Sequence, residues 1–359
     1  MRNICFFNST KFWGGGEKSH FEYALNFQKR NYKVCIITSP GSVLEEKAKA
    51  AQIPVFSLNI GNLSFLNPSK LKLLTLFLQK EEIDTIFLNS SPDLKTGGLA
   101  AKKAGVKNIV YMRGLAVPVK NSPLNRYLLQ KVITHPVPNS KDTRNMFLTH
   151  LSFLDETQVP VIYRGINFEE WDKRAVEPAN FRENDEIIIG NVGRLVEQKG
   201  QHLLIEIAQK LKEKGLHFKL VIAGVGPLEA ALKLHVKKQQ LEDYILFPGF
   251  YSNIRDFLAG IDLFVFPSLW EGFGNALVEA MYEKKPVVAF NRTSNPEIVT
   301  TSENGFLVDY LNLDEFAETI LRLAESPQLR HKIGESACES VRTRFSFDTI
   351  IKEWEELLD

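Results

Sequence analysis

Short apolar segments alternate with amphipathic helical segments along the 359-residue chain. The apolar segments are rich in Ile, Val, Leu and Phe, which is typical of strands buried on both faces of a parallel sheet. We predict strands at residues 3–7, 33–38, 53–57, 85–88, 108–112, 187–193, 217–224, 246–251, 263–266, 286–290 and 306–308. We predict helices at residues 17–30, 69–80, 124–133 and 227–238, from residue 202 onward, and over most of 313–358. This alternation predicts an α/β protein with right-handed crossovers.

The chain length is typical of two domains. A polar segment at residues 169–185, which contains Pro178, separates two series of strands and helices. We therefore predict that residues 1–168 form one α/β domain and that a second parallel α/β domain follows.

The composition indicates a cytoplasmic protein. No run reaches the ~18 apolar residues of a transmembrane helix, and the N-terminus lacks the pattern of a signal peptide. The three cysteines, Cys5, Cys35 and Cys338, are odd in number and widely spaced, which favours reduced thiols. No Cys/His cluster has metal-ligand spacing, so we expect no metal site.

The charge is unevenly distributed. Residues 1–168 hold 22 basic and 11 acidic residues, whereas residues 169–359 hold 22 basic and 32 acidic residues. Residues 95–144 are the most basic part, with Asp142 as their single acid. This asymmetry suggests an anionic partner for the first half, such as a membrane surface or an acidic substrate. Nucleic acid is disfavoured, because aromatic residues do not interleave with the basic cluster as a stacking platform would require.

The helix predicted at 124–133 is basic and rich in leucine. It can rest on a membrane surface, but an amphipathic helix packed on a sheet is the favoured interpretation.

One stretch, residues 267–281, combines a turn with a helix start directly after an apolar strand. Gly272 and Gly274 allow the backbone to approach a ligand closely. The free amides where the helix begins form an anion site. Glu271 lies on the turn, and Glu279 lies about two helical turns in. Taken singly, each Glu is most simply a solvated side chain. Together they suit a nucleotide that carries a polyol through phosphate.

The sequence Glu271-Gly-Phe-Gly-Asn-Ala-Leu-Val-Glu279 resembles the E-x7-E motif of retaining GT-B glycosyltransferases of family 4. The resemblance implies that Glu271 contacts the transferred sugar and that Glu279 contacts the nucleotide ribose. It further implies that the donor lies on the backbone between them. The residues concerned are Gly272, Phe273, Gly274 and Asn275, near the sugar hydroxyls, and Ala276 and Leu277, near the diphosphate.

The resemblance implies the organisation of the whole chain. Two Rossmann-like parallel-sheet domains would face each other across a cleft. Residues 1–168 would bind the acceptor, residues 169–345 would bind the nucleotide-sugar donor, and a helix at 346–359 would cross back to the first domain. Residues 159–167 are similar to the strand and turn that close the first domain in this family.

Two cations follow the first strand of the second domain. Arg194 and Lys199 lie on a loop before a helix, where they can meet two phosphates. Such a pair is common by chance, but G-R-x4-K-G at 193–200 is also a signature of the family. Tyr251 is a further donor-site candidate, because the family holds the nucleotide base with the loop at this position.

Two features of the first half complete the candidate site. Gly14, Gly15 and Gly16 precede a helix and can cradle a phosphate on backbone amides, with a flexible turn as the alternative. Arg113 ends the strand at 108–112, where many family members place a histidine near the donor sugar. Arginine stays protonated and cannot act as a base, but it can stabilise a leaving phosphate or bind an anionic acceptor, unless it forms a structural ion pair.

We therefore predict a retaining glycosyltransferase that moves a hexose-type sugar from a nucleotide-diphosphate sugar to a saccharide or lipid-linked acceptor of the cell envelope. Glu271, Arg194, Lys199 and Arg113 are the predicted catalytic residues, and we expect no cofactor and no metal. The basic first half favours a peripheral enzyme at the inner membrane face. The alternatives are a non-catalytic nucleotide-sugar-binding protein and a nucleotide-sugar epimerase of the same fold.

Overall fold

The computed structural model describes residues 2–359, which divide into two compact units. Residues 2–167 and 347–359 form unit 1, and Phe168–Ser346 form unit 2. Each unit is built on one six-stranded sheet of parallel strands. In the part of the chain that is described, no helix is both long and apolar enough to span a bilayer.

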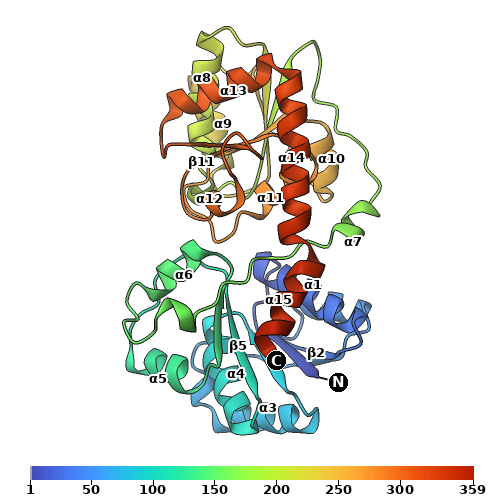
Figure 1. Cartoon of the computed structure of the whole chain (residues 1–359), viewed down its shortest axis with the longest axis vertical. Helices are drawn as coiled ribbons and strands as arrows, with labels where there is room; N and C mark the ends of the chain where they lie inside the picture. Colours follow the sequence, from blue (N-terminus) through green and yellow to red (C-terminus); the bar gives the residue numbers. More distant parts are fainter. Residues whose placement is uncertain (1) are drawn as a thin grey trace. The chain divides into compact units, whose positions relative to one another are not determined.

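Unit 1 contains a sheet of order β3-β2-β1-β4-β5-β6 with helices between the strands (Figure 1). Its strands are β1 (Asn3–Asn8), β2 (Lys33–Thr38), β3 (Val55–Ser57), β4 (Thr85–Leu88), β5 (Asn108–Arg113) and β6 (His135–Pro138). Its helices are α1 (Gly15–Lys29), α2 (Val43–Ala50), η1 (Ser64–Leu66), α3 (Pro68–Lys80), α4 (Ser91–Ala104), α5 (Pro123–Lys131), α6 (Lys141–Leu148), η2 (Glu156–Gln158) and α15 (Phe347–Leu358).

Two apolar cores cover the two faces of the unit 1 sheet. On one face, α3, α4 and α5 bury residues such as Leu74, Leu94 and Leu128. On the other face, α1 packs together with α15, which lies beside it in Figure 1 although it is the last helix of the chain. The ring of Trp354 on α15 lies edge-on to Phe87, with ring centroids 5.1 Å apart. The C-terminal helix therefore belongs to the core of the first unit.

Unit 2 repeats the arrangement with the sheet order β12-β11-β10-β7-β8-β9. Its strands are β7 (Ile187–Val192), β8 (Phe218–Ala223), β9 (Ile245–Leu246), β10 (Leu263–Phe266), β11 (Val287–Phe290) and β12 (Phe306–Val308). Its helices are α7 (Phe168–Asp172), η3 (Glu197–Lys199), α8 (Gln201–Glu213), α9 (Glu229–Lys238), α10 (Ile254–Ala259), α11 (Asn275–Tyr282), α12 (Asn295–Ile298), α13 (Leu313–Glu325) and α14 (Pro327–Phe345).

Several predicted elements differ from the observed ones. The strand and turn expected at 159–167 are an irregular segment, in which Ile162 N donates to Pro138 O at 3.2 Å. Pro160 has no amide hydrogen, so it cannot donate to a regular ladder here. The strand predicted at 246–251 is reduced to Ile245–Leu246. Five helices, α2, α4, α6, α7 and α10, and the strand β6 were not predicted.

Candidate active site

The candidate site of unit 2 lies where the strand order of its sheet reverses. The chain runs from β7 outward to β8 and β9, then returns to β10 on the other side of β7 and continues to β11 and β12. The loops that leave the carboxyl ends of β7 and β10 therefore diverge. Ligands of open α/β sheets bind in the crevice that such diverging loops create.

Backbone contacts hold these two loops in a fixed register. Leu269 N donates to Gln198 O at 2.8 Å, and Gln198 Nε2 donates to Trp270 O at 2.9 Å. Gly200 has a φ of +64°, and a Cβ built on it would lie 2.2 Å from Pro267 O. Only glycine fits this close approach in the left-handed conformation.

The fixed register brings together two predicted residues that are far apart in sequence. Lys199 Nζ lies 2.5 Å from Glu271 Oε1, and the Glu271 side chain is buried. Lys199 Nζ also lies 5.6 Å from the centre of the Phe266 ring. The site thus contains a charge-assisted hydrogen bond between a carboxylate and an ammonium group, set against an aromatic ring.

The turn after Glu271 leads into the N-terminus of α11. Gly274 caps the helix with a φ of +84°, and the first amide bonded back to it is that of Leu277, which donates to Gly274 O at 3.0 Å. The amides of Asn275 and Ala276 precede this bond, so they have no partner within the helix. No acidic residue lies in the first turn. This helix end therefore suits an anion, and Glu279 follows on the same face as Asn275.

Arg194 reaches the same edge of the sheet from the loop after β7. Leu195 N, next to it, donates to Val225 O at 3.0 Å in the loop after β8. A Cβ on Gly226 would lie 2.3 Å from Leu195 O, so the two loops pack backbone to backbone. The Arg194 side chain is exposed, and no ion pair involves it within residues 2–359. Its charge is therefore available to a ligand.

Several buried polar side chains lie around this edge, and of these only Asn275 was among the predicted site residues. The side-chain oxygens of Ser268, Asn275, Ser294 and Asn295 are buried without a hydrogen-bond partner in the structure of residues 2–359. Asn295 Oδ1 lies 3.8 Å from the position of a Cβ on Gly274. Ser294 and Asn295 follow β11, the neighbour of β10. Because they come after a predicted strand, they could have been predicted as site residues from the sequence.

Tyr251 lies in an aromatic cluster in the structure. Its ring centroid is 6.3 Å from that of Phe181 and 5.5 Å from that of Phe257. Burial, followed by the nearby charge of Asp256, raises the pKa of its hydroxyl. Tyr251 follows β9, at the edge of the sheet, and among the described residues no contact joins it to the Lys199–Glu271 pair.

In unit 1, the strand order reverses between β1 and β4. The predicted glycines follow β1 there, and a Cβ on Gly16 would lie 2.8 Å from Asn89 Nδ2 in the loop after β4. Helix α1 begins at Gly15. Its first turn holds the buried Glu17, whose Oε1 accepts from Asn8 Nδ2 at 3.2 Å. Because this carboxylate repels anions at the helix N-terminus, Gly15 and Gly16 fit a hydroxyl-bearing group better than a phosphate.

Asp93 connects the two unit 1 loops. Its carboxylate accepts from Ser9 N at 3.0 Å and from Ser90 N at 2.8 Å. Burial raises the pKa of Asp93, although these hydrogen bonds act in the opposite direction. The role of Asp93 was not predicted, because a local capping pattern contains no information about a second partner that is distant in sequence.

Replacing Asp93 with alanine should therefore destabilise the protein. The change removes a capping box and leaves the buried amide of Ser9 and the half-buried amide of Ser90 without acceptors, so we expect a loss of about 2–4 kcal/mol in the free energy of unfolding. Urea denaturation measures it. Asp155→Ala, which removes the cap of the exposed η2 turn, is the matched control and should cost clearly less. Equal losses would contradict the connecting role of Asp93.

Arg113 ends β5, two strands from β1. Its Nη2 donates to Val117 O at 2.9 Å, and its Nη1 donates to Tyr111 Oη at 3.3 Å. These are neutral partners and not the ion pair that was considered as an alternative. His20 does not take the place of the family histidine. Its ring is buried edge-on against Phe6, and burial lowers its pKa to about 3.

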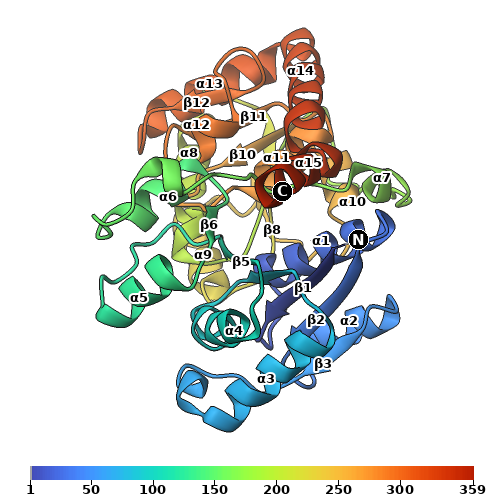
Figure 2. The same ribbon diagram turned by 60° about the horizontal axis from the view of Figure 1, so that its bottom comes forward.

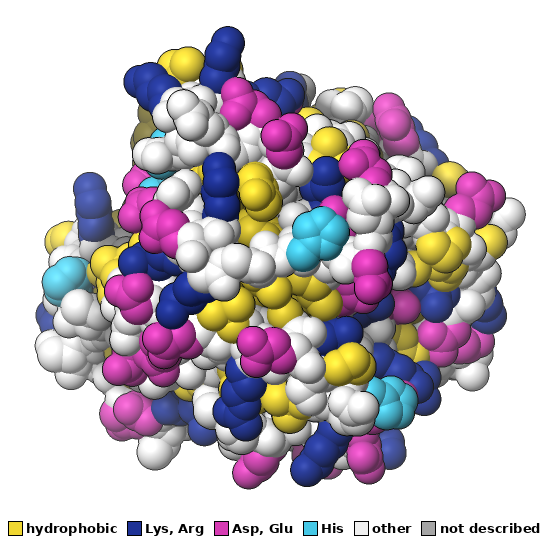
Figure 3. Space-filling view, turned by 90° about the horizontal axis from the view of Figure 1, so that it is seen from above, with side chains coloured by type: hydrophobic (Ala, Val, Ile, Leu, Met, Phe, Trp, Pro, Cys, Tyr) yellow, Lys and Arg dark blue, Asp and Glu magenta, His cyan; other side chains and the backbone are white. Residues whose placement is uncertain are grey.

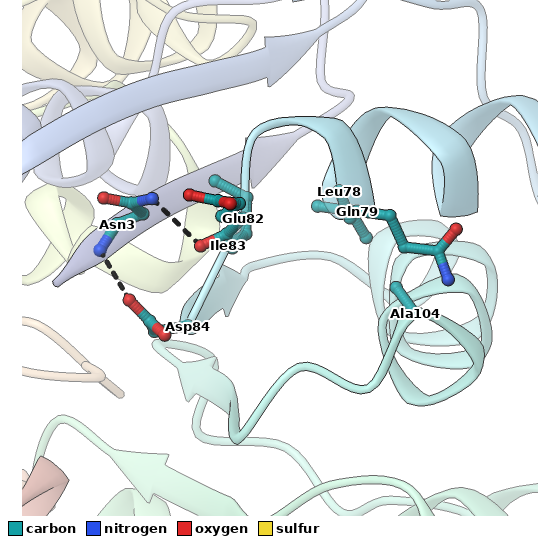
Figure 4. A pocket seen from close by; sticks show the side chains of 7 residues that line it. All are labelled: Asn3, Leu78, Gln79, Glu82, Ile83, Asp84 and Ala104. Carbon is teal, nitrogen blue, oxygen red and sulfur yellow. Dashed lines mark hydrogen bonds between the residues drawn. The ribbon is translucent and has the colours of Figure 1, made fainter.

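A shallow hollow lies at the opposite edge of the unit 1 sheet (Figure 4). Asn3 N donates to Asp84 Oδ2 at 2.9 Å, and Asn3 Nδ2 donates to Glu82 O at 3.0 Å. These residues lie at the amino ends of β1 and β4, opposite the carboxyl ends of the strands where ligands bind. Their polar groups form hydrogen bonds with each other. We assign no site to this hollow.

Two family models match the chain. The model described as Glycosyltransferase Family 4 covers residues 13–170, and the model described as Glycosyl transferases group 1 covers residues 172–340. An uncharacterized glycosyltransferase of Methanocaldococcus jannaschii is 30% identical over 292 residues, which are 79% of this chain and 78% of that protein. The chain belongs to the group 1, family 4 glycosyltransferases.

The fold of this glycosyltransferase is GT-B. A crystal structure of Anabaena Alr3699/HepE in complex with UDP-glucose matches with a TM-score of 0.80 and 22% identity, covering 100% of this chain and 99% of that one. The UDP-Gal:alpha-D-GlcNAc-diphosphoundecaprenol alpha-1,3-galactosyltransferase of Escherichia coli is 26% identical over 329 residues, 86% of this chain and 84% of that protein. The glycosyltransferase spans about half the length or less of four other curated relatives that it matches.

Proposed function

We propose that this glycosyltransferase transfers a hexose-type sugar from a nucleotide-diphosphate sugar, with retention of the anomeric configuration, to a saccharide or lipid-linked acceptor of the cell envelope. One observation carries the proposal. The N-terminus of α11, the Lys199–Glu271 pair and Arg194 meet at the carboxyl ends of β7 and β10, where the strand order reverses.

The diphosphate would lie on the free amides of Asn275 and Ala276. Arg194 and Lys199 supply two positive charges on the neighbouring loop, and negative charge develops on the diphosphate as the bond to the sugar breaks. Preformed donors aimed at such a charge contribute about 3–4 kcal/mol each to the transition state. Cations of the chain can thus perform the task that a metal ion performs elsewhere, and we propose that none is required.

Glu271 would hold a hydroxyl of the donor sugar. Its hydrogen bond to Lys199 stabilises the charged carboxylate, which makes it a better hydrogen-bond acceptor for a sugar than a nucleophile. We therefore propose that the diphosphate leaves from the same face of the donor sugar that the acceptor attacks. The anomeric configuration is then retained without a covalent intermediate on Glu271. Glu279, on the same helix, would bind the ribose diol.

The relatives narrow the substrates that we propose. Alr3699/HepE has been crystallised with UDP-glucose, and the Escherichia coli relative is named for UDP-Gal and a diphosphoundecaprenol-linked sugar. We propose a UDP-hexose as donor and an acceptor that carries a phosphate-linked lipid. An anionic acceptor also agrees with the excess of basic residues in the first half of the chain. The reaction would take place at the cytoplasmic face of a membrane.

A thermal-shift screen in EDTA tests the donor and the metal together. At about 100-fold excess over its dissociation constant, the correct donor adds ~2.7 kcal/mol, which corresponds to roughly 5–10 °C for a domain of this size. We expect a UDP-hexose to give this shift, GDP-, ADP- and dTDP-sugars to give less, and product formation to continue in EDTA. No shift with any nucleotide-sugar would refute the donor site, and activity that returns only with added Mg²⁺ or Mn²⁺ would refute metal independence.

A further inference from the structure

Unit 1 exposes leucines on a surface that the glycosyltransferase site does not use. Helix α3 buries Leu74 and Leu78 in the core but exposes 46% of Leu73 and 52% of Leu76. The loop before it exposes 71% of Leu63 and 66% of Leu66. We call Leu63, Leu66, Lys72, Leu73 and Leu76 the η1–α3 surface. Figure 2 shows α3 on the outside of unit 1, beside α4.

The loop that carries Leu63 and Leu66 is well ordered by its own hydrogen bonds. Gly61 N donates to Ser64 Oγ at 2.9 Å, and Lys70 Nζ donates to Asn59 O at 2.6 Å. Asn67 then caps α3 by accepting from Ser69 N at 3.0 Å. The two leucines are therefore held outward by a structured loop. Their exposure is a property of the fold and not of a frayed segment.

The charge around these leucines has one sign. From Asn59 to Lys80, the segment that carries η1 and α3, the chain contains no acidic residue and three lysines, Lys70, Lys72 and Lys80. Lys72 and Lys80 are exposed on the same side of α3 as Leu73 and Leu76. By contrast, basic and acidic side chains are interspersed on the face that Figure 3 shows. The η1–α3 surface thus combines apolar side chains with positive charge alone.

A hollow of about 700 Å³ adjoins the η1–α3 surface. Its only charged lining residues in the described chain are Lys11 and Lys70, and the remaining lining consists of asparagine, glycine and serine together with Ile60 and Leu63. Such a hollow is suited to a phosphate group that lies next to apolar chains.

We propose that the η1–α3 surface docks on an anionic lipid bilayer. Lysines attract the negative headgroup layer, and outward leucines enter the boundary between headgroups and acyl chains. Helix α5, the membrane helix considered in the sequence analysis, buries Leu128 and Leu129 and exposes polar side chains such as Arg126 and Lys131. Tyr127, 45% exposed, is its single exposed large apolar side chain, so α5 presents mainly charge. The inference rests on the proposed function in one respect, since a lipid-linked acceptor would be located in the bilayer on which this surface docks.

Vesicle flotation tests the proposal without any sugar substrate. We expect the full-length protein to float with vesicles of phosphatidylglycerol and phosphatidylcholine at low salt, to float little with phosphatidylcholine alone, and to be released by ~0.5 M salt. Leu73→Ser with Leu76→Ser should weaken binding at least tenfold. Lys72→Gln with Lys80→Gln should weaken it by about fivefold per lysine. The matched control is Leu234→Ser, which changes a leucine that is 54% exposed on α9 of unit 2 and should leave binding unchanged.

A single-site label tests which surface enters the bilayer. The native cysteines are all buried, so Leu73→Cys and Leu234→Cys can each carry one environment-sensitive dye. We expect a blue shift and quenching by brominated lipid at position 73 and neither change at position 234. Absence of flotation, equal signals at both positions, or full binding by the leucine double variant would overturn the proposal, as would a dimer that forms through these leucines instead. Activity on a short-chain acceptor should survive in the leucine variants. A wild-type protein that is active on this acceptor but does not float with the vesicles would sink this inference and leave the proposed function standing.

Discussion

Glu271→Gln should lower kcat by about 10²–10³-fold while the protein stays folded, because a preformed charged contact in the transition state is lost. The change keeps the shape of a side chain that is buried next to Lys199 but removes its negative charge. We expect Lys199→Gln to lower kcat by a similar factor. Single-turnover rates with the donor identified in the thermal-shift screen measure both effects.

The double variant, Glu271→Gln with Lys199→Gln, distinguishes two roles for Glu271. If Glu271 acts only by positioning Lys199, the double variant should be no slower than either single variant. If the two side chains also contact different parts of the donor, as we propose, the double variant should be slower than either single variant. Its loss should still be smaller than the two single losses combined, because the two side chains share a hydrogen bond.

The Glu229–Lys233 pair, 2.7 Å apart on α9 of the same unit, is the control. Glu229→Gln and Lys233→Gln make the same charge changes on an exposed helix and should leave kcat unchanged. Wild-type kcat in Glu271→Gln would remove this residue from the mechanism.

The local sequence was sufficient to predict the loop and helix that form this site. A strand at 263–266 was predicted and observed as β10, and the helix start predicted within residues 267–281 is that of α11. Apolar runs and glycines act over a few residues, so the pattern alone contains this information. The 2.5 Å contact between Lys199 and Glu271 is different in kind. It depends on β7 and β10 being neighbours, and strand order is not encoded in any local pattern.

Two of the elements that were not predicted, α4 and β6, have local patterns that tertiary packing overrides. Helix α4 contains Gly97 and Gly98, which lower helix propensity. A Cβ on Gly97 would lie 2.4 Å from the Phe7 ring, so glycine is required where α4 crosses the sheet. Strand β6 contains Pro136 and Pro138, which argue against a strand, but β6 is an edge strand and needs fewer ladder amides.

Gly200→Ala should be among the most damaging small substitutions in unit 2. Its φ of +64° disfavours any side chain, and the new Cβ would lie 2.2 Å from Pro267 O, a backbone atom that cannot move without displacing the loop of Glu271. The conformational strain costs about 1–2 kcal/mol, and the clash adds roughly 1–3 kcal/mol. We therefore expect a loss of roughly 2–5 kcal/mol in the free energy of unfolding, measured by urea denaturation, and a fall in kcat beyond what partial unfolding explains.

Gly215→Ala separates the strain from the clash. Gly215 has a φ of +75° and also lies in unit 2, but a Cβ built on it would meet no atom within 4 Å. This control should lose only the conformational part of the stability, about 1–2 kcal/mol, and should keep its activity. The difference between the two variants then measures how strongly the loop after β7 depends on the loop after β10. If both variants lost the same stability and Gly200→Ala kept its kcat, the register of these loops would not be what places Lys199 beside Glu271.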